Sequence, residues 1–173
     1  MNATDTYWQQ YLGYKEEADA EDALSPYPKI PYEQHLPTDP SHPRAFIPNY
    51  VRYAKRKQAG FRCAVTGWHE ADYFRDVSGR GPVRLVGRLT VDHIIPGALG
   101  GLTTDDNIQM VSEFANTKKG SNQINNEELK IRLSEHHQRV ELPEDILAML
   151  RKYNITYYRI GNGGHRHCFR YKL

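Results

Sequence analysis

One stretch of the chain, VDHIIPGALGGLTTDDNIQMVSEFANTKKGSN, combines residue types that suit metal-assisted chemistry on a phosphate. Asp92 offers a hard carboxylate ligand and Asn116 offers an amide oxygen. One carboxylate and one amide leave most of an octahedral shell open, as Mg²⁺ prefers when waters and a substrate phosphate complete it. His93 offers a base with an ordinary pKa of about 6.5. Lys118 and Lys119 follow closely and suit contacts with phosphate.

These side chains need a strand that ends or bends beside a short helix. Asp92 and His93 are neighbours, so on a strand they start out on opposite faces and can share a site only near its end. Pro96 and Gly97 follow closely and stop the strand. The sequence predicts a strand within 83–96, a loop at 97–106, a strand at 107–111 and a helix at 112–119 ending before Gly120.

This stretch resembles the HNH nuclease motif, also called the ββα-metal fold. In that family an Asp-His pair ends the first strand, an Asn opens the second, and a His or Asn lies on the following helix. The intervals here are 14 residues from His93 to Asn107 and nine from Asn107 to Asn116. The DHIIP sequence, the Gly-Gly loop and the N-x-K-x-G ending strengthen the resemblance, which extends from Phe61 to Asn122.

The resemblance implies a role for each motif residue. His93 would be the general base that activates water, and Asp92 and Asn116 would hold one divalent ion, Mg²⁺ or Mn²⁺. That ion would stabilise charge on the leaving 3′-oxygen. Asn107 would fix the His93 ring through its backbone carbonyl or its side chain. The implied activity is metal-dependent hydrolysis of DNA phosphodiester bonds, by nicking or double-strand cleavage, leaving 5′-phosphate and 3′-hydroxyl ends.

Two other functions remain open: a catalytically inactive DNA-binding protein that keeps the HNH scaffold, and a non-specific nuclease toxin. All motif positions are present, which favours catalysis. The size and the basic flanks are typical of a free-standing, site-specific enzyme such as a homing, phage-encoded or small restriction endonuclease. One active site cuts one strand at a time, so a double-strand break needs a homodimer or sequential nicks by a monomer.

Many members of the family also hold a structural zinc with two Cys-x-x-Cys pairs. The matching positions here are Cys63, Thr66, Ser112 and Ala115, so one of the four ligands is present and no structural zinc is expected. Cys63 is then a buried small hydrophobe. Apolar packing must hold the module together, and the side chains expected to supply it are Phe61, Val65, Ile94, Ile108 and Phe114.

Charge is divided unevenly along the chain. Residues 1–43 carry two basic and eight acidic side chains, and residues 44–173 carry 21 and 13, so the net charge of +2 hides an acidic arm on a basic body. A basic body favours a polyanionic partner, here double-stranded DNA. Beyond the two lysines of the motif, the expected DNA contacts lie on a basic helix near Pro48 and on a C-terminal hairpin: Arg52, Lys55, Arg56, Arg166 and Arg170.

These elements together predict an α+β protein, with the ββα module embedded among flanking helices and followed by a C-terminal β-hairpin. Three regions are expected: an acidic, Pro-rich arm and linker (1–43), the nuclease core with its basic helix (44–125), and C-terminal helices with the hairpin (126–173). The arm is expected to dock on the body through Tyr7, Trp8, Tyr11 and Leu12. The remaining local predictions are a short strand within 61–67 that runs into a turn at Gly67, a loop at 68–83, and helices at 126–137 and 143–152.

The sequence also indicates where the protein resides. No apolar run approaches the ~20 residues that a membrane span needs. The N-terminus lacks the basic start and apolar stretch of a secretory signal. Two cysteines cannot form a disulfide framework. We therefore expect a cytoplasmic protein with no membrane partner.

Overall fold

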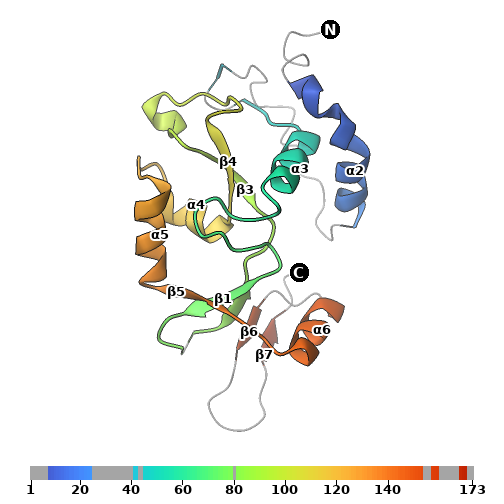
Figure 1. The fold of residues 1–173 in the computed structure, drawn as a ribbon, viewed down its shortest axis with the longest axis vertical. Helices are drawn as coiled ribbons and strands as arrows, with labels where there is room; N and C mark the ends of the chain where they lie inside the picture. Colours follow the sequence, from blue (N-terminus) through green and yellow to red (C-terminus); the bar gives the residue numbers. More distant parts are fainter. Residues whose placement is uncertain are drawn as a thin grey trace.

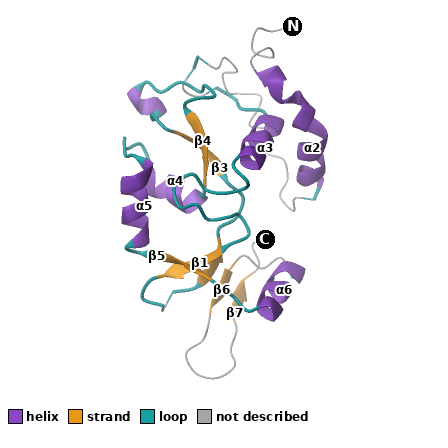
Figure 2. Ribbon diagram, viewed as in Figure 1, coloured by secondary structure: helices purple, strands orange, loops and turns teal. Residues whose placement is uncertain are grey.

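The computed structural model describes residues 8–24, 41–42, 45–79 and 81–153, and the backbone of strands at 157–159 and 168–170. Over these residues the fold is mixed α+β, with short helices around two antiparallel sheets (Figure 1, Figure 2). The predicted α+β class is therefore confirmed. Within this part of the chain, no helix has the length and apolar character to cross a bilayer.

The smaller sheet forms the centre of the molecule. It pairs β3 (Thr90–His93) with β4 (Ile108–Val111) in antiparallel register. The helix α4 (Glu113–Lys119) follows β4 directly and ends at Gly120, whose φ of 57° suits glycine. A short 3₁₀ turn, η3 (Gly97–Leu99), lies in the connecting loop. The predicted order of strand, loop, strand and short helix is confirmed.

The larger sheet lies at the opposite end of the molecule from the N-terminal helices (Figure 1). Its strand order is β5-β1-β2-β6-β7, and every pairing is antiparallel. The helix α6 (Glu144–Lys152) packs against this sheet through the fully buried Leu150. The strands are β1 (Tyr73–Asp76), β2 (Val83–Leu85), β5 (His137–Val140), β6 (Tyr157–Arg159) and β7 (Cys168–Arg170).

This sheet corrects two sequence predictions and agrees with two. The expected loop at 68–83 contains β1, and the helix expected to reach His137 is α5 (Asn126–Ser134), which ends earlier, so that His137 begins β5. Both missed strands have four residues and pair with each other across a long stretch of sequence, with Tyr73 opposite Val140, although β1 also pairs with the nearby β2. The helix at 143–152 is confirmed, and β6 pairs with β7 as the expected hairpin does.

Glycine and one unusual phenylalanine explain two further corrections. The single strand expected within 83–96 is divided at Gly87, whose φ is 77°, so that β2 and β3 enter different sheets. The turn expected at Gly67 is confirmed by its φ of 71°, but the short strand expected before it is wrong, because Phe61 has a φ of 56° and residues 64–66 form a tight turn. The turn is closed by Gly67 N–H donating to the Cys63 carbonyl at 2.8 Å.

The N-terminal arm packs on the body through η1 (Gln9–Tyr14) and α2 (Lys15–Ala23). The helix α3 (Asn49–Gln58) lies between α2 and the small sheet (Figure 1). Trp8 and Tyr11 are buried against α3 and β4, as predicted, but Leu12 is 47% exposed, so its predicted docking is wrong. Tyr7 and the Pro-rich segment 25–40 lie outside the described residues.

The core of the ββα module is an apolar cluster that joins the Cys63 turn to β3, β4, α4 and α5. Cys63 and Val65 are buried there and Phe114 packs against them, as expected. Ile108 is buried in a second apolar cluster, with Val51 and Ala54 of α3. Ile94 is 47% exposed, so its predicted place in the core is wrong.

Candidate active site

The buried side of the candidate site is the contact between β3 and α4. Asp92 is buried, and its Oδ2 accepts hydrogen bonds from Lys119 Nζ and Gln109 Nε2, both at 2.7 Å. Thr90 lies two residues earlier on the same face of β3, and its Oγ1 accepts a bond from Asn116 Nδ2 at 3.3 Å. Asn116 and Lys119 are one helical turn apart. Asp92 and Asn116 therefore share one interface, on facing elements.

The side chain of Lys119 points into this interface and not to the protein surface. Only 1% of the residue is exposed. Besides Asp92, its ammonium donates hydrogen bonds to the backbone carbonyls of His93 and Ile94. A buried ammonium needs such a full set of partners because it has lost its water. The prediction that Lys119 contacts phosphate is corrected, while the neighbouring Lys118 is exposed and available for that contact.

The oxygen atoms left over at this interface suit a hard cation. Both hydrogen bonds to Asp92 use Oδ2, and Oδ1 accepts none from any residue that the structure describes. Asn116 likewise uses its nitrogen with Thr90, which leaves its Oδ1 as an acceptor. Over the described ranges, no three His, Cys, Asp or Glu side chains gather as a ligand cluster. The donors present therefore fit an ion that keeps most of its waters, as Mg²⁺ does.

His93 is the last residue of β3, and its side chain lies on the face of the strand opposite Asp92. Its Nε2 lies 2.9 Å from Oγ1 of Thr103, which is fully buried. Burial lowers the pKa of His93, and the charge of Lys119 lowers it further; the opposing charge of Asp92 does not restore the ordinary value. The neutral imidazole, which can accept a proton, is therefore the form favoured at neutral pH. Nε2 faces Thr103, so Nδ1 is the nitrogen that can accept a proton from water in the tautomer that carries its hydrogen on Nε2.

Asn107 acts on the loop backbone rather than on the His93 ring. Its Oδ1 accepts from Ile95 N at 2.8 Å, and its Nδ2 donates to the carbonyls of Ile95 at 3.2 Å and Leu102 at 2.7 Å. Its own carbonyl accepts from Ile94 N at 2.8 Å. The expected direct contact with the ring is corrected: Asn107 ties together the two ends of the loop, and Thr103 contacts the ring.

Thr103 and Gln109 are the two residues of this site that sequence reasoning missed. Thr103 lies in a loop without hydrophobic periodicity, so no pattern distinguishes it from Thr104. Gln109 could have been found, because residues at alternate positions of β4 share a face and β4 was expected to pair with β3. In the observed register Gln109 lies directly opposite Asp92.

Two basic side chains of helix α3, Lys55 and Arg56, form ion pairs with carboxylates of the same chain. Arg56 is 2% exposed, and its guanidinium donates to Glu21 and Glu70 at 2.6–2.8 Å. Burial would lower the pKa of Arg56, but the two carboxylates raise it above the ordinary value. Lys55 pairs with Asp105 at 2.6 Å. The prediction that Arg56 contacts DNA is therefore wrong, because Arg56 lies in an internal ion pair. Lys55 is partly buried in a pair with Asp105, whose side chain is 41% exposed, so its contact with DNA stays a prediction.

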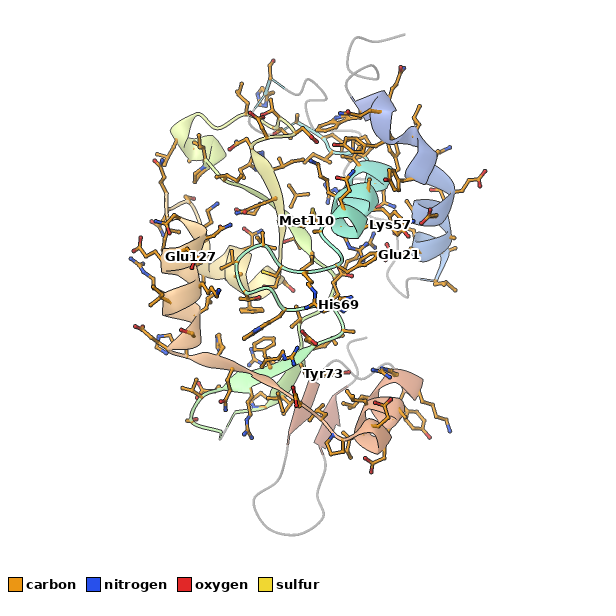
Figure 3. All side chains as sticks on the ribbon, in the orientation of Figure 1. Glu21, Lys57, His69, Tyr73, Met110 and Glu127 are labelled. Carbon is orange, nitrogen blue, oxygen red and sulfur yellow. The ribbon has the colours of Figure 1, made fainter. Side chains whose placement is uncertain are left out.

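Three of the predicted DNA contacts remain: Arg52, Arg166 and Arg170. Arg52 is exposed, and its Nε donates a hydrogen bond to the Ile47 carbonyl at 3.0 Å, so its contact with DNA stays a prediction. Figure 3 shows the side chains of Glu21 and Lys57 in the region between α2 and α3, where acidic groups of the arm meet the basic helix. Arg166 and the side chain of Arg170 lie outside the described residues.

Comparisons of the chain with protein-family models, with curated proteins and with solved structures give no match in any of the three. The motif and the geometry described above are therefore the observations that bear on the function of this chain.

Proposed function

We propose that this protein is a divalent-metal-dependent HNH endonuclease that hydrolyses DNA phosphodiester bonds. The observation that carries the proposal is the contact of β3 with α4, which brings Asp92 and Asn116 to one interface at the end of the strand that also bears His93. The motif spacing alone predicts this order of elements. The geometry adds two oxygen atoms, Asp92 Oδ1 and Asn116 Oδ1, that accept no hydrogen bond from the described part of the chain, and a nearby base whose lowered pKa favours the neutral form.

Each side chain then has a distinct task. Asp92 and Asn116 would hold the ion, and Lys119 and Gln109 keep the carboxylate in one orientation by bonding its other oxygen. When bound, the ion would polarise a non-bridging phosphate oxygen and stabilise charge on the leaving 3′-oxygen. His93 would take a proton from the attacking water at Nδ1. Attack of that water on phosphorus would form one P–O bond and break the bond from phosphorus to the 3′-oxygen. The 3′-oxygen then takes a proton from solvent water, which gives 5′-phosphate and 3′-hydroxyl ends.

The direct test is cleavage of supercoiled plasmid DNA by the purified full-length chain in the presence of Mg²⁺. Loss of general-base catalysis typically costs about 10²–10⁴-fold in rate, so His93→Ala should reduce cleavage by that amount and retain DNA binding. His136→Ala is the matched control, because His136 is exposed and lies away from β3. EDTA should stop the wild-type reaction, and Mn²⁺ should restore it. A His93→Ala variant that cuts at the wild-type rate refutes the base assignment.

One observation favours a second candidate, a DNA-binding protein that keeps the scaffold without catalysis. The ammonium of Lys119 already balances the charge of Asp92 at 2.7 Å, so that an ion binding there would meet a cation on the other carboxylate oxygen. Titration of the wild-type chain with Mn²⁺, followed by paramagnetic broadening of NMR signals, separates the two functions. Broadening centred on Asp92 and Asn116 supports the nuclease. An unaffected interface, together with an intact plasmid, supports the binding protein.

The proposal extends to site-specific cutting by a free-standing enzyme. The experiment is digestion of a panel of plasmid and phage DNA followed by mapping of the ends. Discrete fragments with 5′-phosphate ends support site specificity. A continuous smear on DNA and RNA would instead support the non-specific toxin.

A further inference from the structure

The loop between β3 and β4 crosses itself just beyond His93. Gly101 is buried at the crossing, and a Cβ added there would lie 1.8 Å from the Ile95 carbonyl oxygen and 2.9 Å from Asn107 Nδ2. Only glycine fits such an approach of two backbone segments. The three side-chain bonds of Asn107 to Ile95 and Leu102 close the same crossing. The loop is therefore fixed on one side of Thr103.

A second anchor fixes the loop on the other side of Thr103. Asp105 Oδ1 accepts a hydrogen bond from the hydroxyl of Tyr11 at 2.5 Å, and it forms an ion pair with the ammonium of Lys55 at 2.6 Å. Lys55 also donates to the Asp105 carbonyl at 3.3 Å. The arm and α3 thus hold the loop at a point two residues from Thr103. A side chain between two such anchors has little freedom to move.

Thr103 uses this fixed position to contact the candidate base. It is 0% exposed, and its Oγ1 lies 2.9 Å from His93 Nε2. Burying a hydroxyl without a hydrogen-bond partner is unfavourable, so the ring and the hydroxyl stabilise each other. The two nitrogens of an imidazole are not equivalent, because a bond at one determines which of them carries the proton.

We propose that Thr103 is a positioning residue that accepts a hydrogen bond from Nε2–H of His93, fixing the ring orientation and leaving Nδ1 free to accept a proton from water. This inference rests on the proposed function, since it gives the contact a purpose in catalysis. Thr103 itself touches neither DNA nor the ion. Its effect on the reaction passes entirely through the His93 ring.

The test combines spectroscopy with kinetics on the full-length chain. In ¹⁵N-labelled wild-type protein, the ring nitrogens of His93 should give the NMR signature of the Nε2–H tautomer. Thr103→Val removes the hydroxyl at nearly constant shape and should mix the two tautomers. One neutral hydrogen bond corresponds to about a 3- to 10-fold change, so the kcat of Thr103→Val should fall by that factor, with KM for plasmid DNA unchanged. Thr103→Ser should recover both the tautomer and kcat.

Thr117→Val is the matched control, because Thr117 is exposed on α4 and should leave kcat and the tautomer unchanged. An Nδ1–H tautomer in the wild-type protein overturns the inference, even if Thr103→Val fails to fold. A folded Thr103→Val variant with wild-type kcat overturns it as well. Wild-type protein that shows the Nε2–H tautomer but cleaves no DNA refutes the proposed function and the catalytic purpose of the contact, while the contact itself stands.

Discussion

Two buried cations, Arg56 and Lys119, use their charges in different ways. Arg56 lies between α2 and the body and faces two carboxylates, Glu21 and Glu70. Lys119 lies beneath β3 and faces one carboxylate and two backbone carbonyls. The first arrangement joins two parts of the chain, and the second orients a candidate ligand. A basic residue near a nuclease-like motif therefore need not face DNA, and burial separates the two cases.

Arg56→Met should give the largest loss of stability. Removing one partner of a buried ionic cluster typically costs about 3–5 kcal/mol, because the remaining charges stay buried without compensation. Here both Glu21 and Glu70 would be left without their main partner. Urea unfolding of the variant measures the effect, and Arg52→Met on the exposed face of α3 serves as the control. A cost below about 1 kcal/mol would mean that this cluster behaves like an exposed ion pair.

Lys119→Met should lower the free energy of unfolding by less, about 3 kcal/mol. A divalent metal ion should restore the lost stability. The variant leaves Asp92 buried without its ammonium, so a divalent ion gains a carboxylate that no other cation occupies. Binding to the folded state alone raises stability with ion concentration. Thermal unfolding with and without Mn²⁺ should therefore show a larger increase in Tm for Lys119→Met than for wild type or Lys118→Met. An equal increase in all three contradicts the placement of the ion beside Asp92.

Acid should release the arm before it unfolds the module. Burial alone would raise the pKa of Glu21, but the hydrogen bonds and charge of Arg56, with the charge of Arg88, leave it below the ordinary 4.5. A lowered pKa contributes stability that is complete above pH 4.5 and is lost as the pH falls through the lower folded value. Fluorescence of Trp8 in a Trp68→Phe background should report exposure of the arm in that range.

The matched pair for this experiment is Glu21→Gln and Glu16→Gln. Glu21→Gln should weaken arm docking already at neutral pH, because the amide cannot balance Arg56. Glu16 is exposed on the same helix and its substitution should have no effect. Identical acid transitions in both variants would show that Glu21 does not hold the arm.

Lys118→Ala should have the smallest effect. The side chain is exposed at the end of α4 and is expected to contact one phosphate. Removing one such contact should weaken DNA binding for all sequences alike and reduce the slope of log K against log salt by about one. A salt titration of binding measures this slope. An unchanged slope would remove Lys118 from the DNA contacts.

The sequence was informative where a local pattern determines structure. The β3-loop-β4-α4 order, the helix α6 and the burial of Trp8 and Tyr11 were all predictable from residue spacing. The strand β1 was not, because its four residues lie among glycine and proline signals that favour a loop. The strand β5 was also missed, because its partner β1 lies more than 50 residues away, and no periodicity reports such a pairing. The same reason hid Thr103 and the pairing of Arg56, since both depend on tertiary contacts. Charge patterns thus located the basic residues but not their partners.

The bond between Tyr11 and Asp105 joins residues separated by 94 positions, and this has a consequence for biosynthesis. Tyr11 leaves the ribosome long before Asp105 exists, so that the loop beside His93 acquires its second anchor only after most of the polypeptide has been made. Nascent chains that end before Asp105 lack the bond between Tyr11 and Asp105. A ribosome-bound fragment ending before residue 105 should therefore contain the arm and α3 but lack the Asp105 contact that fixes the loop beside His93.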